Sequence, residues 1–218
     1  RQRQMCIRDS LATIGGALGN LELLPWIVTA YMISSTVSAP LLGKLSDSYG
    51  RRKMLLLSLG IFLGGSLLCA LAPSMIALVL ARTVQGIGGG GLMSLVQAAI
   101  ADVVPPRERG RYQAYTAGMW AISSVAGPVL GGLIADHMHW SMIFWLNLPL
   151  GIAAIVFSDR LLRRLPFHGV KHRLDLLGSL LLVLAATALL LALNWGGHRY
   201  AWISAPVLGL LALAVALT

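Results

Sequence analysis

Residues 41–56, LLGKLSDSYGRRKMLL, place a dense group of charges between two apolar runs. Asp47, Arg51, Arg52 and Lys53 follow one another closely, while the flanking residues are almost all apolar. Apolar surface leaves water spontaneously, whereas a charged group is costly to remove from water. A short connection between two membrane-spanning helices satisfies both demands, because it holds the charges at the bilayer surface.

The composition of the chain also indicates a membrane protein. It is 57% hydrophobic and 11% charged, with a mean hydropathy of +0.77. A soluble domain carries about 25% charged residues, so this chain has too little polar surface to cover a globule. Its formal charge of +9 would fit a nucleic-acid partner, but membrane topology also produces a basic excess. Cys6 and Cys69 show no metal-type spacing and are expected to be free thiols.

Seven stretches approach the roughly 20 apolar residues that a helix needs to cross a hydrocarbon core. These stretches are 25–45, 54–72, 76–101, 114–135, 140–158, 176–195 and 201–218. Strands of a membrane barrel would instead show short alternating segments. We therefore expect an all-α membrane protein, a truncated helical bundle with about seven transmembrane helices.

The basic residues between these spans alternate strongly. The first, third and fifth connections carry 4, 3 and 5 Lys or Arg, whereas the second, fourth and sixth carry 0, 0 and 1. Loops rich in Lys and Arg stay in the cytoplasm, which orients the chain. The positive charge is thus explained by topology, and a nucleic-acid partner is not expected. The predicted location is the cell (inner) membrane, in multi-pass form.

The two ends of the chain fit this pattern less well. The stretch 11–24 is too short to span a bilayer alone, and RQRQMCIRDS at the start does not resemble a signal peptide. We expect a fragment that lacks an initial helix and its C-terminal part. The predicted segments are an irregular or foreign stretch, a helical bundle, a basic cytoplasmic connection and two further helices, at 1–24, 25–158, 159–175 and 176–218.

The charged loop contains more than basic anchors. Gly43 allows close helix approach, and Gly50 permits the positive φ of a tight turn. Asp47 can accept hydrogen bonds at a neighbouring helix N-terminus. Arg51 and Arg52 can bind carboxylates, backbone carbonyls or lipid phosphates. A plain positive-inside anchor is the alternative, and it explains this combined spacing less well.

Arg82 is the one ionisable side chain well inside a predicted span, about 10 Å from its outer boundary at 1.5 Å per residue. Facing lipid would cost at least about 2.5–3.5 kcal/mol, so we expect it to face a polar cavity. Gln85 and Gly86 follow at i+3 and i+4 and share its face. The alternative is an arginine that reaches the headgroups or binds carbonyls for stability alone.

A later span carries a Gly-Pro-Gly-Gly pattern. Gly127 and Gly131 form a small-xxx-small seam that favours close helix packing, with Gly132 beside it. Pro128 is expected to kink the helix. Packing alone would explain the seam, and the functional hypothesis is that it also governs rocking between inward and outward states.

Tryptophans near span ends, among them Trp140, are expected to anchor at the interface between the hydrocarbon core and water.

Four stretches, in order, resemble motifs of the major facilitator superfamily. The charged loop is similar to its G-x-L-x-D-x-x-G-R-[RK]-x signature, and LARTVQGIGGGGL (80–92) resembles its fourth-helix motif. AGPVLGGLIAD (126–136) resembles the fifth-helix motif of its antiporters. HWSMIFWLNLPLG (139–151) resembles the start of the sixth helix in the fourteen-span drug:proton antiporter branch, the EmrB/QacA type, through Trp140, Phe144, Asn147, Pro149 and Gly151.

This resemblance implies a secondary active transporter that exports hydrophobic or cationic drug-like compounds in exchange for protons. The chain would hold helices two to eight of fourteen. The implied transport and gating residues are Arg82, Gln85, Gly86, Gly127, Pro128, Gly131 and Gly132, and the loop of Gly43, Asp47, Gly50, Arg51 and Arg52 would latch the inward-closed state.

The partners implied are a small hydrophobic or cationic substrate, protons and membrane lipids, with accessory export subunits unknown. No cofactor or metal is expected. The sequence departs from the family pattern in its extra glycine within GIGGGG and in Ser141, which replaces a usual Arg. The acidic residue that the family commonly carries on its first helix is not found, so the proton-coupling residue is not assigned.

Two alternatives stay open. A transporter of the same fold could carry a metabolite, a lipid or a siderophore, because fold does not fix cargo. An intramembrane enzyme is disfavoured, because the spans carry no Ser/His, di-Asp or metal-binding constellation.

Overall fold

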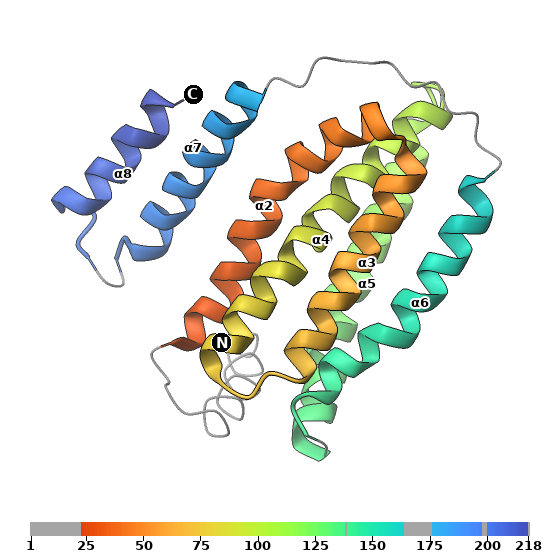
Figure 1. Cartoon of the computed structure of the whole chain (residues 1–218), viewed down its shortest axis with the longest axis horizontal. Helices are drawn as coiled ribbons and strands as arrows, with labels where there is room; N and C mark the ends of the chain where they lie inside the picture. Colours follow the sequence, from red (N-terminus) through yellow and green to blue (C-terminus); the bar gives the residue numbers. More distant parts are fainter. Residues whose placement is uncertain (1–22, 138, 164–175, 198–199, 218) are drawn as a thin grey trace.

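The computed structural model describes residues 23–137, 139–163, 176–197 and 200–217, and seven helices lie within them. They are α2 (Leu24–Tyr49), α3 (Arg51–Ala70), α4 (Met75–Val103), α5 (Arg109–His137), α6 (Met142–Leu162), α7 (Leu176–Trp195) and α8 (Ala205–Ala216) (Figure 1). Five of them, α2 to α6, are long and apolar enough to cross a membrane. The predicted all-α membrane fold is confirmed.

Several helices extend beyond the apolar stretches that predicted them. α2 runs on to Tyr49, α5 begins at Arg109, and α6 ends at Leu162 rather than near Ser158. An apolar run marks the thickness of the hydrocarbon core, not the end of the backbone hydrogen-bond ladder. Only Gly50 separates α2 from α3, and its φ of 97° is the positive value that the sequence predicted.

Helix α4 lies between α2 and α3 at the centre of the bundle (Figure 1). Its glycine run, 86–91, gives it two faces that approach other helices closely. A Cβ on Gly90 would meet the carbonyl oxygen of Ser35 on α2, whereas a Cβ on Gly88 would lie 2.7 Å from the carbonyl oxygen of Ser58 on α3. The glycines that depart from the family motif thus let one helix pack against two neighbours.

The face of α2 toward α4 carries small polar side chains at helical spacing. Ser34 and Ser38 are buried there, next to Gly86 and Gly90 of α4. The hydroxyl of Ser38 donates a hydrogen bond to the carbonyl oxygen of Ile87 across the contact, at 3.0 Å. In a bilayer the hydrophobic effect does not drive helices together, because lipid tails are as apolar as the side chains. Close packing of small residues and interhelical hydrogen bonds hold the helices together instead.

The remaining helices are attached more loosely. α6 packs along α3, while α5 lies behind α3 and α4 and contacts its neighbours little (Figure 1). α7 and α8 pack against each other beside α2. The amide of Asn194 on α7 donates a hydrogen bond to the Thr29 hydroxyl on α2 at 2.8 Å, which links this pair to the bundle.

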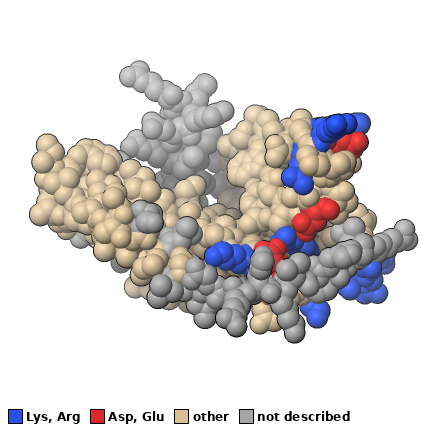
Figure 2. Space-filling view, turned by 90° about the horizontal axis from the view of Figure 1, so that it is seen from above, with Lys and Arg blue, Asp and Glu red and all other residues tan. Residues whose placement is uncertain are grey.

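The described charges are gathered at one end of the helices. Figure 2 looks down on that end and shows Lys and Arg over the α2–α6 bundle and none over α7 and α8. Among the described residues, every Lys and Arg except Arg82 lies in or next to the α2–α3 and α4–α5 connections or at the end of α6. This arrangement matches the alternation in the sequence, and we refer to this end as the cytoplasmic end.

Candidate functional site around Arg82

Arg82 lies inside the bundle and contacts two aromatic rings. Its guanidinium carbon is 4.7 Å from the ring centre of Phe144 on α6 and 5.9 Å from that of Tyr31 on α2. A guanidinium at this distance is attracted by the negative face of the ring, and the attraction grows when water is excluded. Arg82 therefore faces protein rather than lipid, as its cost in hydrocarbon requires.

Gln85 extends the polar contacts of Arg82 to α3. A terminal nitrogen of Arg82 donates to Gln85 Oε1 at 3.0 Å, and Gln85 Nε2 donates to Ser66 Oγ at 2.7 Å. Asn147 on α6 reaches the same hydroxyl at 3.5 Å, and the Cys69 thiol lies 3.9 Å from Gln85 Oε1. Gln85 is 1% exposed, so this network joins three helices in the interior.

Buried apolar side chains cover this polar network on the side toward the α3–α4 connection, opposite the cytoplasmic end. Cys69, Ala72, Met75 and Leu78 form one core cluster together with Ile27, Ala81, Trp140 and Phe144. The prediction that Trp140 anchors at the interface is wrong: it is 5% exposed and packs edge-to-face on Phe144 at 6.2 Å. Trp140 lies in the turn just before α6, and its ring points into the core, where it packs on Phe144 in the first turn of that helix.

One nitrogen of Arg82 is left over. Its Nε is buried and has no hydrogen-bond partner among the described residues. The ion pairs within the described part of the chain also do not include Arg82. Among the described residues, the buried charge of Arg82 is balanced by two ring faces and the side-chain amide of Gln85. Such a charge can bind a further hydrogen-bond acceptor or an anion. It also makes the electrostatic potential of its surroundings more positive.

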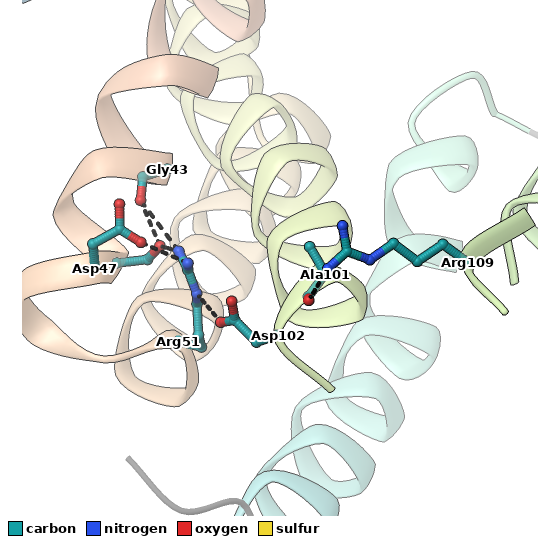
Figure 3. A network of polar contacts seen from close by, with 7 residues as sticks. Gly43, Asp47, Arg51, Ala101, Asp102 and Arg109 are labelled. Atoms are coloured by element: carbon teal, nitrogen blue, oxygen red, sulfur yellow. Dashed lines mark hydrogen bonds and ion pairs between the residues drawn. The ribbon is translucent and has the colours of Figure 1, made fainter. Parts of the chain in front are cut away.

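The signature loop forms a second polar cluster at the cytoplasmic end (Figure 3). Arg51 contacts the carboxylate of Asp47 at 2.5 Å and that of Asp102 at 2.8 Å, and it also donates to the Ser46 hydroxyl. The carbonyl oxygen of Gly43 lies at 3.5 Å from the same guanidinium. Arg51, the first residue of α3, thus links its own helix to α2 and α4. Asp47 on α2 is its carboxylate partner from the preceding helix.

Two further arginines connect neighbouring helices at this end. Arg52 contacts Asp159 on α6 at 2.5 Å, and Arg163 contacts the same carboxylate at 2.6 Å. Arg109, the first residue of α5, donates to the carbonyl oxygen of Ala101 on α4 at 2.7 Å (Figure 3). The basic residues of the loops therefore hold helix ends together as well as marking the cytoplasmic side.

The Gly-Pro-Gly-Gly seam lies on α5, apart from both clusters. Within the part of the chain that the structure describes, no atom comes within 4 Å of a Cβ built on Gly127, Gly131 or Gly132. Its role in helix packing and in gating stays a prediction. By contrast, a Cβ on Gly151 of α6 would meet the Leu63 side chain on α3, so the glycine of the sixth-helix motif lies in the α3–α6 contact.

Comparison with known proteins settles the family. The family model described as Major Facilitator Superfamily matches residues 10–172. The chain belongs to the major facilitator superfamily. The match spans the signature loop, Arg82, the Gly-Pro-Gly-Gly seam and the sixth-helix motif.

Individual relatives agree with this assignment. The chain is 40% identical over 208 residues to an uncharacterised MFS-type transporter of Mycobacterium tuberculosis, covering 95% of this chain and 30% of the relative. It is 38% identical to the multidrug transporter protein MdtP of Bacillus subtilis, over 96% of this chain and 38% of that protein. It is 40% identical to the efflux pump FUS6 of Gibberella moniliformis, again over 95% and 38%.

The chain spans about a third of the length of these relatives. As a member of a transporter family with several membrane-spanning helices, it is a multi-pass membrane protein. The described residues hold no group of three or more His, Cys, Asp or Glu that could bind a metal ion.

Sequence reasoning placed Gln85 beside Arg82 but missed the residues that α2 and α3 contribute to the cluster. Tyr31, Ser66 and Cys69 lie on other helices, and nothing in their local sequence distinguishes them from ordinary packing residues. Asp102 and Asp159, to which the sequence analysis gave no role, are the partners of the loop arginines Arg51 and Arg52. Their positions at the cytoplasmic ends of α4 and α6 were a usable signal, because opposite charges at neighbouring helix ends tend to meet.

Proposed function

We propose that the full-length protein is a secondary active transporter that exports hydrophobic or cationic drug-like compounds in exchange for protons. The observation that carries this proposal is the buried polar cluster of Arg82, Gln85, Ser66 and Asn147 with the rings of Tyr31 and Phe144. Polar groups buried between helices at membrane depth commonly mark a substrate or ion pathway. Membership in a transporter family, with relatives named as multidrug transporters and efflux pumps, supports the same function.

The cluster suits this task chemically. The rings offer apolar and cation-attracting faces, and the amides of Gln85 and Asn147 offer donors and acceptors that orient a substrate. The positive charge of Arg82 would favour the ionised form of any carboxylate brought next to it. A carboxylate that moves toward Arg82 would therefore release its proton, which couples helix movement to proton release. In this proposal the seam of Gly127 and Gly131 allows the rocking motion, and Arg51 with Asp47 latches the inward-closed state.

We further place the protein in the fourteen-span antiporter branch, in the cell membrane. The paired helices α7 and α8, which pack beside α2 rather than within the α2–α6 bundle, support this placement. The sixth-helix motif from Trp140 to Gly151 supports it too.

Flux into vesicles tests the proposal. The full-length protein is reconstituted in liposomes, and uptake of a fluorescent lipophilic cation is followed with an acidic, neutral or alkaline lumen. Uptake that requires an acidic lumen and stops with a protonophore is expected for exchange against protons. Uptake without pH dependence would reject proton antiport, and transport of a metabolite, lipid or siderophore in place of the cation would reject the substrate class.

A further inference from the structure

A hollow of about 460 Å³ lies between α3 and α6 at the cytoplasmic end. Leu56, Ile155 and Val156 form its apolar part, and Asp159, Arg160 and Arg163 form its polar part. The two parts are ordered along the helix axis, because Ile155 and Val156 lie about one turn deeper in the membrane than the arginines. The hollow thus changes from apolar to cationic in the direction from hydrocarbon to headgroups.

The charges at its rim do not cancel. Arg52 binds Oδ1 of Asp159 through two nitrogens, at 3.0 and 2.5 Å, and Arg163 binds Oδ2 at 3.0 and 2.6 Å. Both carboxylate oxygens are therefore occupied. Arg160 takes part in no ion pair with the described residues. Among the described residues, three guanidinium groups against one carboxylate leave an excess of two positive charges at this rim.

The shape of this charge distribution identifies a ligand class. A phosphate next to a guanidinium makes charge-assisted, often bidentate hydrogen bonds. Basic pockets between transmembrane helices on the cytoplasmic side bind the headgroups of acidic lipids, which are enriched in that leaflet. A free phosphate would use the arginines alone and leave the apolar floor of Leu56, Ile155 and Val156 without a role.

We propose that this hollow, the α3–α6 groove, is a binding site for one anionic phospholipid. The phosphate lies on Arg160 and Arg163, and an acyl chain lies along Leu56, Ile155 and Val156. Bound there, the lipid bridges α3 and α6 beside the Arg52–Asp159 ion pair and adds to the contact between these helices. The site is separate from the Arg82 cluster, so lipid binding and transport are measured independently.

Native mass spectrometry of the full-length protein tests the site directly. Phosphatidylglycerol and phosphatidylcholine are added in increasing amounts to the protein in detergent, and bound lipids are counted. We expect tighter binding of one phosphatidylglycerol than of phosphatidylcholine. Arg160→Gln should weaken the phosphatidylglycerol affinity about fivefold, the change expected for one cation near an anionic headgroup. Arg107→Gln, which removes an exposed charge at the same end but outside the groove, should leave it unchanged.

Two further measurements separate a lipid from a simple anion. Val156→Trp fills the apolar floor, keeps every charge and should also weaken phosphatidylglycerol binding. Glycerol phosphate, which has no acyl chains, should not displace the lipid. Equal binding of the two lipids, equal effects of Arg160→Gln and Arg107→Gln, or displacement by glycerol phosphate would each overturn the proposal.

Discussion

The guanidinium carbon of Arg82 lies 4.7 Å from the ring centre of Phe144, so a buried charge on α4 rests against an aromatic face on α6. Phe144 is 2% exposed, which keeps the contact away from both lipid and water. A cation–π contact of this kind contributes about 0.5–2 kcal/mol, more as the site becomes drier. The fourth-helix motif and the sixth-helix motif therefore contribute to one cluster, through Arg82 and Phe144 respectively.

Replacement of Phe144 by Leu should weaken both stability and transport. The substitution keeps the position apolar but removes the ring face and leaves space beside Arg82, and we expect a loss of about 1–3 kcal/mol in stability. Thermal unfolding in detergent and substrate flux measure the two effects. Phe157→Leu on the same helix, where the side chain is 66% exposed, is the matched control. Equal effects of the two substitutions would contradict a special role for Phe144.

Gly88 should tolerate alanine far less well than Gly64. A Cβ at position 88 would meet the backbone of Phe62 and lie 2.7 Å from the carbonyl oxygen of Ser58, whereas no described atom lies within 4 Å of a Cβ at position 64. Overpacking at a tight contact costs about 1–3 kcal/mol, while alanine in an open helix position is favourable by up to about 1 kcal/mol. A lower melting temperature for Gly88→Ala, with Gly64→Ala unchanged or higher, is the expected pair of results. A tolerant Gly88 would refute the α3–α4 contact.

The helices were predictable because lipid imposes strong rules on sequence. Long apolar runs indicated the seven helices, and the alternation of Lys and Arg predicted that the charges gather at one end of them. The positive φ of Gly50 followed from local turn geometry alone. Each of these features depends on residues close together in the chain.

The partners across helices were not predictable, because they depend on how the helices rotate and pack. Trp140 stands at a span end, where tryptophan usually anchors, yet it turns into the core toward Phe144. The glycine run of α4 was noted as a departure from the motif, and only the packing of two neighbours on α4 explains it. Tyr31 reaches Arg82 from a helix about 50 residues away in the chain, with no motif to indicate it.

Arg51 should matter for the conformational cycle more than for stability. Its ion pairs with Asp47 and Asp102 are partly exposed, and such pairs contribute about 0–1 kcal/mol each. Arg51→Gln should change the melting temperature little but lower transport several-fold, because α2, α3 and α4 lose their common link. Arg107→Gln serves as the control of equal charge. Full transport by Arg51→Gln would rule out the latch.

Labelling from each side of the membrane tests the orientation. Single cysteines in place of Lys53 and Glu108, in a full-length protein whose other accessible cysteines, Cys6 among them, are replaced by serine, should react with a membrane-impermeant maleimide only from the cytoplasm. A cysteine in place of Ser74, which precedes α4 at the other end, should react only from outside. The buried native Cys69 gives no background, because it is 0% exposed. Reaction of positions 53 and 108 from opposite sides would refute the topology.

Substrate flux through an Arg82→Ala variant tests the central claim most directly, namely that the Arg82 cluster is part of the transport pathway. Alanine removes the charge, the bond to Gln85 and both ring contacts at once. Arg82→Lys keeps the charge but not the planar group and should recover only part of the activity. We predict that Arg82→Ala inserts at normal levels and shows no uptake driven by an acidic lumen. Uptake equal to that of the unsubstituted protein would contradict the account and leave Arg82 with a structural role.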